Sequence, residues 1–450
     1  LSEHSVSSTN IEATIMQKIA RGGVYAALLF SLLLGVMACA GGSPVASSAT
    51  QNVTFMTFGD PAERDAYRTL VDAFHEAHPE IRVEMTHIPS PSDYRTRLAT
   101  EFAAGNPPDV TLMNYRRFAA FAATDVLEPL GPYLDKSELI QESDFYPVTI
   151  DGFRWNDTVI CIPQNISSLV VYYNEDLFDA AGVPYPSDDW TWEDFLETAK
   201  ALTRDTNGDG AMDQYGLGTE PSLFRLAPFV WQNGAPIVDS TEAASRLTLT
   251  RPPSLEALQW FVDLRQVHGV VPDRVEEAAL DSESRFIGGQ TAMFLNSRRG
   301  TPTYREITAF SWDIAPLPRH KEIAGVLHSD GYCMSKTTAN KEAAWTFIEF
   351  ANSVEGQSII VQSGRTVPSL IEVAESPLFL DPDTSPSRSR VFLDTVPALR
   401  RVPVISTWEE IEKVASEEIE RAFYGDISAE QAANLAVQRT EEYFQAGRRP

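Results

Sequence analysis

The sequence predicts an α/β protein made of two lobes, and three observations lead to this expectation. The chain has 450 residues, whereas a single hydrophobic core stops growing at about 250–300 residues. Hydrophobic residues make up 43% and aromatic residues 10% of the chain, which is enough to fill the cores of well-packed lobes. Segments with strand and helix patterns alternate along the first part of the chain, and this alternation indicates mainly parallel sheets flanked by helices.

The first lobe begins with a succession of strand, helix, strand, helix and strand. The strands are predicted at 53–58, 81–85 and 109–113, the second because apolar and polar residues alternate there. The first helix follows the turn Gly59-Asp60-Pro61 and ends before Pro79. Apolar residues at helical spacing mark the two helices, namely Tyr67, Leu70, Val71 and Phe74 in the first and Tyr94, Leu98 and Phe102 in the second.

Later elements are marked by apolar periodicity and by capping signals. An apolar run at 168–173 is typical of a strand, and a helix is expected to start after Thr191, with which Asp194 forms a capping box. Further helices are predicted at 254–268, 340–352 and 407–424. The last should open with a second capping box, made by Thr407 and Glu410.

Charge and motifs narrow the class of function. The formal net charge is −27, which argues against a nucleic-acid partner because phosphate binding needs a basic face. The sequence contains no GxSxG elbow, no HExxH, no Walker loop and no GxGxxG after a strand. A secreted glycoside hydrolase would need two carboxyl groups about 5–10 Å apart, and no such pair stands out among the 63 acidic residues. We therefore expect a protein that is not an enzyme, with a carbohydrate-active hydrolase as one alternative.

The first part of the chain has the pattern of an export signal. Lys18 and Arg21 precede a short apolar run, and this run is too short and wrongly flanked for a membrane span. It ends at Val36-Met37-Ala38-Cys39, which resembles a bacterial lipobox. We expect a signal peptide at 1–39, lipidation of Cys39 and a flexible tether at 40–50, with an ordinary secretory signal as the alternative. The protein would then be anchored to the outer face of the cytoplasmic membrane, or be periplasmic.

The other two cysteines, Cys161 and Cys333, lie in apolar runs typical of strands. No two cysteines have zinc-ligand spacing. Two interpretations remain open from the residues: two buried thiols, or a disulfide, which an exported protein can keep.

A loop at 205–213 fits the start of a calcium-binding pattern, D-x-N-x-D-G-x-x-D. Its candidate ligands are Asp205, Asn207, Asp209 and Asp213. Gly216 stands where a bidentate Glu is expected, so the loop can equally be a hydrogen-bonded Asx turn. No cofactor is expected to be required, and calcium, if bound, would be structural.

Six segments after Cys39 carry a family resemblance by their order. They are TFMTFGDPAERDAYRTLVDAFHEAHPEIRVE, AGNPPDVTLMN, ICIPQNISSLVVYYNEDLFDAAGVPYPSDDWTWEDF, FIGGQTAMFLN, DIAPLPRHKEIAGVLHSDGYCMSK and NKEAAWTFIEFANSVEGQ. In this order they resemble the extracellular solute-binding proteins of family 1, the maltose-binding-protein-like receptors of ABC importers. The resemblance covers essentially everything after Cys39.

The resemblance implies a fold and a division of the chain. The fold is the two-lobed type II periplasmic-binding-protein fold, in which the chain crosses the hinge three times, here near 163–168, 324–327 and 396–402. Lobe one would comprise 51–164 plus 326–396, and lobe two 165–325 plus 397–450.

The implied function is that of a monomeric carbohydrate-binding lipoprotein. It would close two lobes on a sugar or an oligosaccharide and deliver it to the permease subunits of an ABC importer. A surface receptor that senses a ligand without transport is a further alternative.

Ligands of such folds lie beyond the carboxyl ends of strands, where loops and helix N-termini converge. The resemblance implies ligand contacts in the turn after the first strand, in the segment at 114–117, in the hinge and near two tryptophans. The expected substrate-binding residues are Phe58, Asp60, Asn114, Tyr115, Arg116, Ser167, Trp231, Asn296, Arg298, Arg299, Asp330, Tyr332, Arg365 and Trp408.

The chain departs from the family pattern in its arginines. After AMFLN many relatives have Gly-x-Trp, whereas this chain has Ser297-Arg298-Arg299-Gly300, and Arg116-Arg117 stand where maltose-type relatives have an aromatic residue and a carboxylate. Guanidinium groups bind acidic or phosphorylated sugars in bidentate fashion, so an anionic glycan is one hypothesis. The alternative is that these arginines form ion pairs between the lobes or contact sugar hydroxyls.

Overall fold

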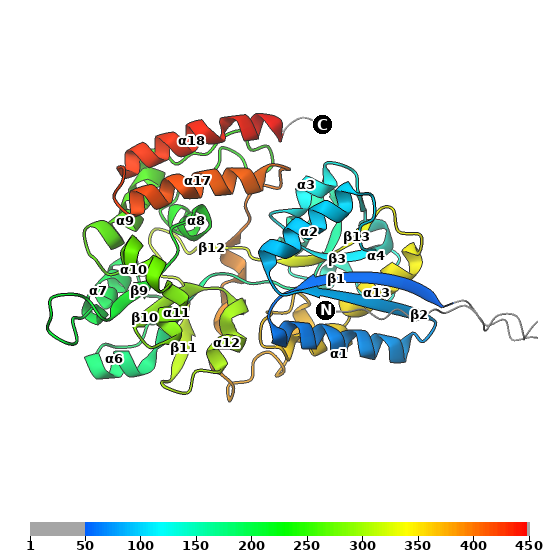
Figure 1. Cartoon of the computed structure of the whole chain (residues 1–450), viewed down its shortest axis with the longest axis horizontal. Helices are drawn as coiled ribbons and strands as arrows, with labels where there is room; N and C mark the ends of the chain where they lie inside the picture. The colour runs from blue at the N-terminus through cyan, green and yellow to red at the C-terminus, as the bar shows by residue number, and fades with distance from the viewer. Residues whose placement is uncertain (1–49, 448–450) are drawn as a thin grey trace, which may run out of the picture. The chain divides into compact units, whose positions relative to one another are not determined.

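Residues 50–447 are described by a computed structural model and fold around two β-sheets (Figure 1). The predicted signal peptide at 1–39 with Cys39, the tether except residue 50, and residues 448–450 lie outside the described residues. Among the described helices, none is both long and apolar enough to cross a membrane. We call the larger sheet with its helices lobe one, and the smaller sheet with its helices lobe two.

Lobe one is built on a six-stranded sheet in the order β2-β1-β3-β13-β4, with β7 also paired to β13. Strand β1 runs parallel to β2 and β3, whereas β13 runs antiparallel to β3, β4 and β7. The strands are β1 (Gln51–Phe58), β2 (Ile81–Ile88), β3 (Val110–Asn114), β4 (Leu127–Glu128), β7 (Cys161–Pro163) and β13 (Asp330–Ser335). The helices are α1 (Pro61–Ala77), α2 (Pro91–Ala103), α3 (Phe118–Ala122), α4 (Gly131–Leu134), α5 (Pro147–Gly152), α13 (Lys341–Ala351), α14 (Val354–Val361) and α15 (Ile371–Ala374), with a hairpin of β5 (Arg154–Trp155) and β6 (Thr158–Val159).

Helix α1 illustrates how the sequence sets an element of lobe one. The side chain of Asp60 accepts a hydrogen bond from the Glu63 amide and caps the helix, and Pro61 occupies its first turn. The four apolar residues at helical spacing, Tyr67, Leu70, Val71 and Phe74, are all buried as predicted. Burying each such side chain stabilises the fold by roughly 1.5–3 kcal/mol, so the packing of α1 against α13 and α14 anchors this face of the lobe.

Lobe two is built on a four-stranded sheet in the order β11-β8-β10-β9. Strand β10 runs parallel to β9 and antiparallel to β8, which is also antiparallel to β11. The strands are β8 (Val170–Asn174), β9 (Tyr215–Gly218), β10 (Thr291–Asn296) and β11 (Trp312–Ala315). The helices are α6 (Glu175–Ala181), α7 (Trp192–Leu202), α8 (Leu223–Gln232), α9 (Pro252–Gln266), α10 (Arg274–Ala279), α11 (Ser282–Ile287), α12 (Thr301–Arg305), α17 (Trp408–Phe423) and α18 (Ala429–Ala446). Helices α17 and α18 lie side by side, in orange and red respectively in Figure 1.

Both sheets are mixed, whereas the sequence predicts mainly parallel ones. Strand β3 ends at Asn114, and β13 begins opposite it at Asp330. The chain enters lobe one from the hinge when it reaches β13, so this strand must run opposite to strands that end at the hinge. In lobe two, β8 leaves the hinge and lies antiparallel to β10, which returns toward it.

The capping signals have different outcomes. Thr191 and Asp194 form the predicted capping box at the start of α7. The box predicted for α17 is wrong: Thr407 makes no cap, and its hydroxyl instead donates a hydrogen bond to the Tyr443 carbonyl, at 2.8 Å. The tight packing of α17 on α18 offers that hydroxyl a buried acceptor, which replaces the cap.

The hinge consists of three chain segments held by backbone hydrogen bonds, as predicted. Ser167 and His328 exchange two such bonds, of 2.7 and 2.8 Å. Strand β12 (Gly325–Val326) pairs with β14 (Leu399–Arg400). The exact lobe bounds stay a prediction. Residues 387–388 fall in lobe one by the predicted bounds, but they donate hydrogen bonds to Asp313 of lobe two. Helix α16 (Arg390–Asp394) and the 3-10 helices at 142–144, 298–300 and 396–398 complete the described elements.

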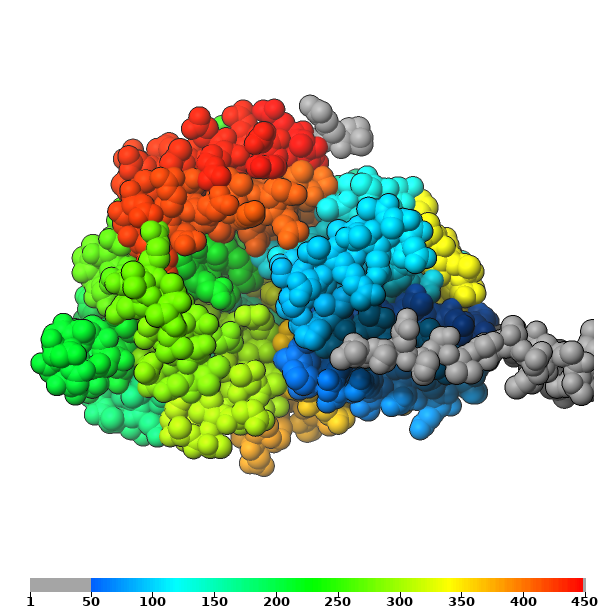
Figure 2. Space-filling view, in the orientation of Figure 1, coloured from blue at the N-terminus to red at the C-terminus, as the bar shows by residue number. Residues whose placement is uncertain are grey.

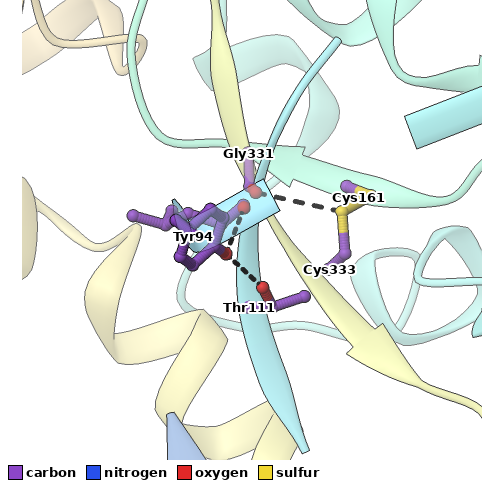
Figure 3. The surroundings of a disulfide bond; sticks show 6 residues. Tyr94, Thr111, Cys161, Gly331 and Cys333 are labelled. Carbon is purple, nitrogen blue, oxygen red and sulfur yellow. Dashed lines mark hydrogen bonds between the residues drawn. A yellow bond between two sulfur atoms is a disulfide. The ribbon is translucent and has the colours of Figure 1, made fainter. Parts of the chain in front are cut away.

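Cys161 and Cys333 form a disulfide, which decides between the two interpretations left open by the sequence (Figure 3). They stand directly opposite each other on β7 and β13, with Cα atoms 4.4 Å apart. Strand β7 leads into the first hinge segment and β13 follows the second. The disulfide therefore ties two hinge strands together at the point where they enter lobe one.

Candidate ligand-binding site

A cavity of about 560 Å³ lies between the two lobes. This volume falls within the range of small-molecule sites, about 300–1,000 Å³. In Figure 2 the cyan surface of lobe one faces the orange surface of α17 across the line where the lobes meet. Lobe one and the hinge contribute Phe58, Pro91, Tyr94, Arg95, Leu98, Ala99, Leu112, Met113, Asn114, Arg116, Arg117, Ala120, Phe121, His328, Asp330 and Arg365, and lobe two contributes Glu220, Ser222, Phe224, Arg225, Asn296, Ser297, Arg299, Glu409 and Glu412.

Aromatic rings stand on both walls of the cavity. Phe58 and Tyr94 of lobe one lie with ring centroids 4.7 Å apart, and Phe121 lies on the same wall. Phe224 of lobe two lies under the guanidinium of Arg116, 4.2 Å from its ring centroid. These rings offer apolar faces beside the polar groups of the cavity.

Asn114 ends β3 and Asp330 begins its neighbour β13, both at the cavity. The Asn114 amide donates a hydrogen bond to the Asp330 carboxylate, at 3.1 Å, and both face the cavity. The carboxyl end of β3 therefore supplies a polar pair at the edge where open α/β sheets bind their ligands.

Arg365 pairs with two carboxyl groups of lobe one, Asp60 and Glu63, and burial raises the pKa of the Glu63 carboxyl to about 8. Its guanidinium lies 2.9 Å from Asp60 and 2.6 Å from Glu63. Burial lowers the pKa of Arg365, but the carboxylates of Glu63 and Asp60 raise it above its usual value. Gly59, at φ 130°, allows this arrangement, because a Cβ at Gly59 would lie 1.5 Å from a Glu63 carboxylate oxygen.

Arg116 forms an ion pair that crosses the cavity. Its guanidinium lies 2.5 Å from Glu412 on α17, and the Trp408 indole donates a hydrogen bond to the other Glu412 oxygen, at 3.1 Å. Burial lowers the pKa of Arg116, but Glu412 raises it above its usual value. Arg117 makes a second, more exposed pair with Glu409, at 3.0 Å. Arg116 and Arg117 therefore form ion pairs between the lobes. The sequence left such pairs open as the alternative to contacts with a ligand.

Comparison with known proteins places the chain in a family. The model of the family described as bacterial extracellular solute-binding protein matches residues 60–358. The chain belongs to this family. The family consists of proteins that bind solutes, and its members work outside the cytoplasm.

Curated relatives and solved structures agree with this membership. A binding protein of Brucella abortus (strain 2308) is 23% identical over 393 residues, which cover 85% of this chain and 90% of the relative. The sn-glycerol-3-phosphate-binding periplasmic protein UgpB of Escherichia coli (strain K12) is 23% identical over 56% of this chain and 57% of its own length.

Two solved structures show the same two-lobed fold. The ABC substrate-binding protein Lmo0181 from Listeria monocytogenes, in complex with cycloalternan, has a TM-score of 0.80 and 26% identity, over 88% of this chain and 99% of that chain. Maltose-bound MalE3 of T. maritima has a TM-score of 0.73 and 22% identity, over 87% and 99% of the two chains.

The structure of this solute-binding protein brings half of the predicted contact residues to the cavity. They are Phe58, Asn114, Arg116, Asn296, Arg299, Asp330 and Arg365. Asp60 lies behind Arg365. Ser167 lines a small crevice of about 20 Å³, which Asp330 and Arg365 also line.

The other predicted residues are buried and do not line the cavity. Trp408, 1% exposed, packs into the core and holds Glu412, while Tyr115, Trp231 and Tyr332 are core side chains. Their rings are taken up by core packing and so are not available to the cavity.

Arg298 is also buried outside the cavity lining. Its guanidinium donates to the Gly364 carbonyl and to the Ser389 hydroxyl, both at 2.9 Å, and lies over the rings of Phe379 and Phe392. Burial lowers its pKa to about 9. These contacts give Arg298 a structural role.

Sequence reasoning missed Phe224 and Arg225, which lie in the first turn of α8. Ser222 caps this helix by accepting a hydrogen bond from the Arg225 amide. A capping serine ahead of an apolar helix was the available signal, since a helix N-terminus that faces the hinge points its first turn at the cleft.

The loop at 205–213 is closed by hydrogen bonds from its own amides. Asp205 accepts from Gly208 at 2.6 Å and from Gly210 at 2.8 Å, and Asp213 accepts from Thr206 at 2.9 Å. Within residues 50–447 no group of three or more His, Cys, Asp or Glu side chains is placed to hold a metal ion. Calcium binding by this loop stays a prediction.

Proposed function

We propose that this solute-binding protein captures a sugar or an oligosaccharide between its lobes and hands it to an ABC importer, without catalysing a reaction. The observation that carries the proposal is the cavity of about 560 Å³ lined from both lobes. Aromatic rings can stack on the C–H faces of a sugar, and the amide, carboxylate and guanidinium groups can bind its hydroxyls. The solved structures of Lmo0181 with cycloalternan and of MalE3 with maltose support a carbohydrate.

Capture between two walls supplies the signal that transport needs. A ligand that contacts both lobes favours the closed state by its differential affinity for that state. Phe224 and Glu412 of lobe two face Phe58, Asn114 and Arg116 of lobe one across the cavity. A closed, loaded receptor can then be distinguished from an open one by the permease.

Export and anchoring form a second part of the proposal. We infer that the chain is processed at Cys39, lipidated there and held as a monomer at the outer face of the cytoplasmic membrane, with 40–50 as a tether. The test is expression of the full chain in bacteria with a labelled fatty acid. Label and membrane association should both be lost in Cys39→Ser, and an unchanged distribution of that variant would contradict the anchor.

The binding test uses the chain from residue 39 with Cys39 replaced by serine. Its melting temperature is measured with a panel of mono- and oligosaccharides, with and without calcium, and hits are titrated by calorimetry. A ligand at 100 times its dissociation constant should add about 2.7 kcal/mol of stability. Product analysis after long incubation should find the sugar unchanged.

A matched pair of variants connects binding to the cavity. Phe224→Leu removes a ring that faces the cavity and should weaken sugar binding about 2- to 10-fold, because an aromatic face contributes about 0.5–1.5 kcal/mol beyond its area. Phe310→Leu, in lobe two and outside the cavity lining, is the control. Equal loss in both variants, or no binding of any sugar, would contradict the proposal.

A further inference from the structure

Arg225 is a buried cation with incomplete compensation on the lobe-two wall. Its side chain is 7% exposed and it lines the cavity. One carboxylate, that of Glu220, lies 3.2 Å from its Nη2, and this Glu220 side chain is 55% exposed. The Arg225 Nε is buried and has no hydrogen-bond partner among the described residues.

The physical environment of Arg225 calls for a negative charge. Burial lowers its pKa, Glu220 only partly reverses this, and the charge of Arg299 lowers it further. A buried cation is costly unless it is paired and hydrogen-bonded, and Arg225 is neither fully. The N-terminus of α8, in whose first turn Arg225 stands, adds partial positive charge.

Arg299 adds a second, more available guanidinium to the same wall. Its side chain is 44% exposed, and its nearest carboxylate, Glu283, lies 3.6 Å away. That carboxylate is already shared, because Glu283 also accepts hydrogen bonds from Tyr304, at 2.6 Å, and from Asn296, at 3.2 Å. Arg299 therefore keeps donors free to face the cavity.

Two lobe-one arginines of the cavity, Arg365 and Arg116, differ from these two. Arg365 has carboxylates at 2.6 and 2.9 Å, and Arg116 has one at 2.5 Å. The pKa of each is raised above its usual value by these carboxylates, although burial alone would lower it. Within one cavity, Arg365 and Arg116 of lobe one therefore have closer carboxylates than Arg225 and Arg299 of lobe two.

We propose that Arg225 and Arg299 form a subsite for an anionic group of the bound sugar, either a carboxylate or a phosphate. This inference rests on the proposed function and specifies the class of sugar. Guanidinium forks bind both kinds of anion with two parallel hydrogen bonds. The Arg225 Nε gains the acceptor that it lacks, and exposed Glu220 can move into solvent as the anion enters. Ser222 and Ser297, on the same wall, can bind the adjoining hydroxyls.

The test compares neutral and anionic members of matched sets. The probes are glucose, galactose and mannose, their uronates, their 6-phosphates, glycerol with sn-glycerol 3-phosphate, and inorganic phosphate. Melting temperature ranks them, and calorimetry at two salt concentrations gives the affinity of each hit. The variant is Arg225→Met, and the control is Arg319→Met, which removes a positive charge of the same lobe outside the cavity lining.

The subsite predicts that an anionic probe binds more tightly than its neutral partner. Arg225→Met should weaken that binding at least about 10-fold, since hydrogen bonds to charged groups are the strong ones. It should change binding of the neutral partner less than about 3-fold, and Arg319→Met should change neither. The uronate and phosphate arms distinguish the two anions. Arg299→Met, at a partly exposed position, gives a second variant if Arg225→Met does not fold.

Three results would overturn the inference in distinguishable ways. Neutral sugars that bind equally to the wild type and to Arg225→Met, with no preference for anions, would remove the subsite and leave the proposed function standing. An absence of binding by every probe would remove the proposed function and the subsite with it. Equal weakening by Arg225→Met and Arg319→Met would assign the effect to net charge and reject the subsite.

Discussion

The two walls of the cavity differ in how each lobe handles charge and order. The lobe-one wall is held by the Cys161–Cys333 disulfide and by the buried group of Arg365, Asp60 and Glu63. The lobe-two wall carries Arg225 with an unpartnered Nε and Arg299 with a distant carboxylate. Arg365 of lobe one is therefore paired within the protein, whereas Arg225 and Arg299 of lobe two keep binding capacity for a ligand.

This difference suits a clamp that must hold its hinge in register while it accepts a solute. Preorganised groups lower the cost of ordering a site when the ligand arrives. Groups without partners gain most from the ligand, because an unsatisfied buried donor is costly. Lobe one thus provides a preorganised surface, while lobe two provides ligand contacts that stabilise the closed state.

Removal of the disulfide should have the largest effect on lobe one. The sequence separation of the two cysteines is 172 residues, and the chain-entropy model gives about 5 kcal/mol for a loop of this length. We expect Cys161→Ala with Cys333→Ala to lower the free energy of unfolding by up to this amount, as measured by urea titration. The reduced wild-type protein should behave in the same way. An unchanged unfolding midpoint would show that lobe one does not depend on the disulfide.

His328 should make stability depend on pH at the hinge. Burial lowers its pKa to about 4, against the effect of Asp330, while Arg116, Arg299 and Arg365 lower it further. Between about pH 6.5 and about pH 4, the unfolded chain, whose histidine has a pKa near 6.5, binds a proton at this position and the folded chain does not. This contribution is fully present above about pH 6.5 and is lost as the pH falls from about 6.5 to about 4, by up to about 3 kcal/mol.

The measurement is the free energy of unfolding from pH 7.5 to 4.5 for the wild type and for His328→Gln. Other groups titrate in both proteins, so the difference between the two curves isolates His328. The variant should lose less stability on acidification than the wild type. Parallel curves would contradict a neutral, partly buried histidine at the hinge.

The interlobe ion pairs should give a smaller effect that depends on burial. Arg116 and Glu412 are 10% and 19% exposed, whereas Arg117 and Glu409 are 27% and 51% exposed. A double-mutant cycle with Arg116→Met and Glu412→Gln should give a coupling of about 1–3 kcal/mol. The matched cycle on Arg117 and Glu409 should give less than about 1 kcal/mol. Equal coupling energies would contradict the distinction between the buried Arg116–Glu412 pair and the exposed Arg117–Glu409 pair.

Much of the fold could be predicted from local patterns. The spacing of Tyr67, Leu70, Val71 and Phe74 placed α1, and the alternation after Ile81 placed β2. Strand direction was harder, because it depends on where the chain re-enters a lobe and not on any local signal. The α17 cap failed for a related reason: Thr407 found an acceptor on α18, which only the tertiary structure brings near.

Part of the site could be predicted from the sequence: the polar residues at strand ends were placed correctly, and most of the aromatic residues were not. Asn114 ends β3 and Asp330 begins β13, both at the hinge, so their positions followed from the order of elements. Trp408 and Tyr332 were predicted to contact the ligand but are 1% and 0% exposed, because nothing in the sequence tells which face of an element a ring will take. Arg225 was not predicted, because the sequence does not show that its Nε lacks a hydrogen-bond partner.

The most direct test of the account is the sign of two stability changes. In chloride buffer without ligand, Arg365→Met should lower the free energy of unfolding by about 3–5 kcal/mol, because Asp60 and buried Glu63 lose their cation. Arg225→Met should leave stability unchanged or raise it by about 1 kcal/mol, because it removes a buried charge whose partner, Glu220, is solvated. Opposite or clearly unequal changes in the free energy of unfolding would support an Arg365 that is paired within lobe one and an Arg225 that lacks an anionic partner in lobe two. Equal losses in the two variants would show that Arg225 is as fully paired as Arg365, and the account would be wrong.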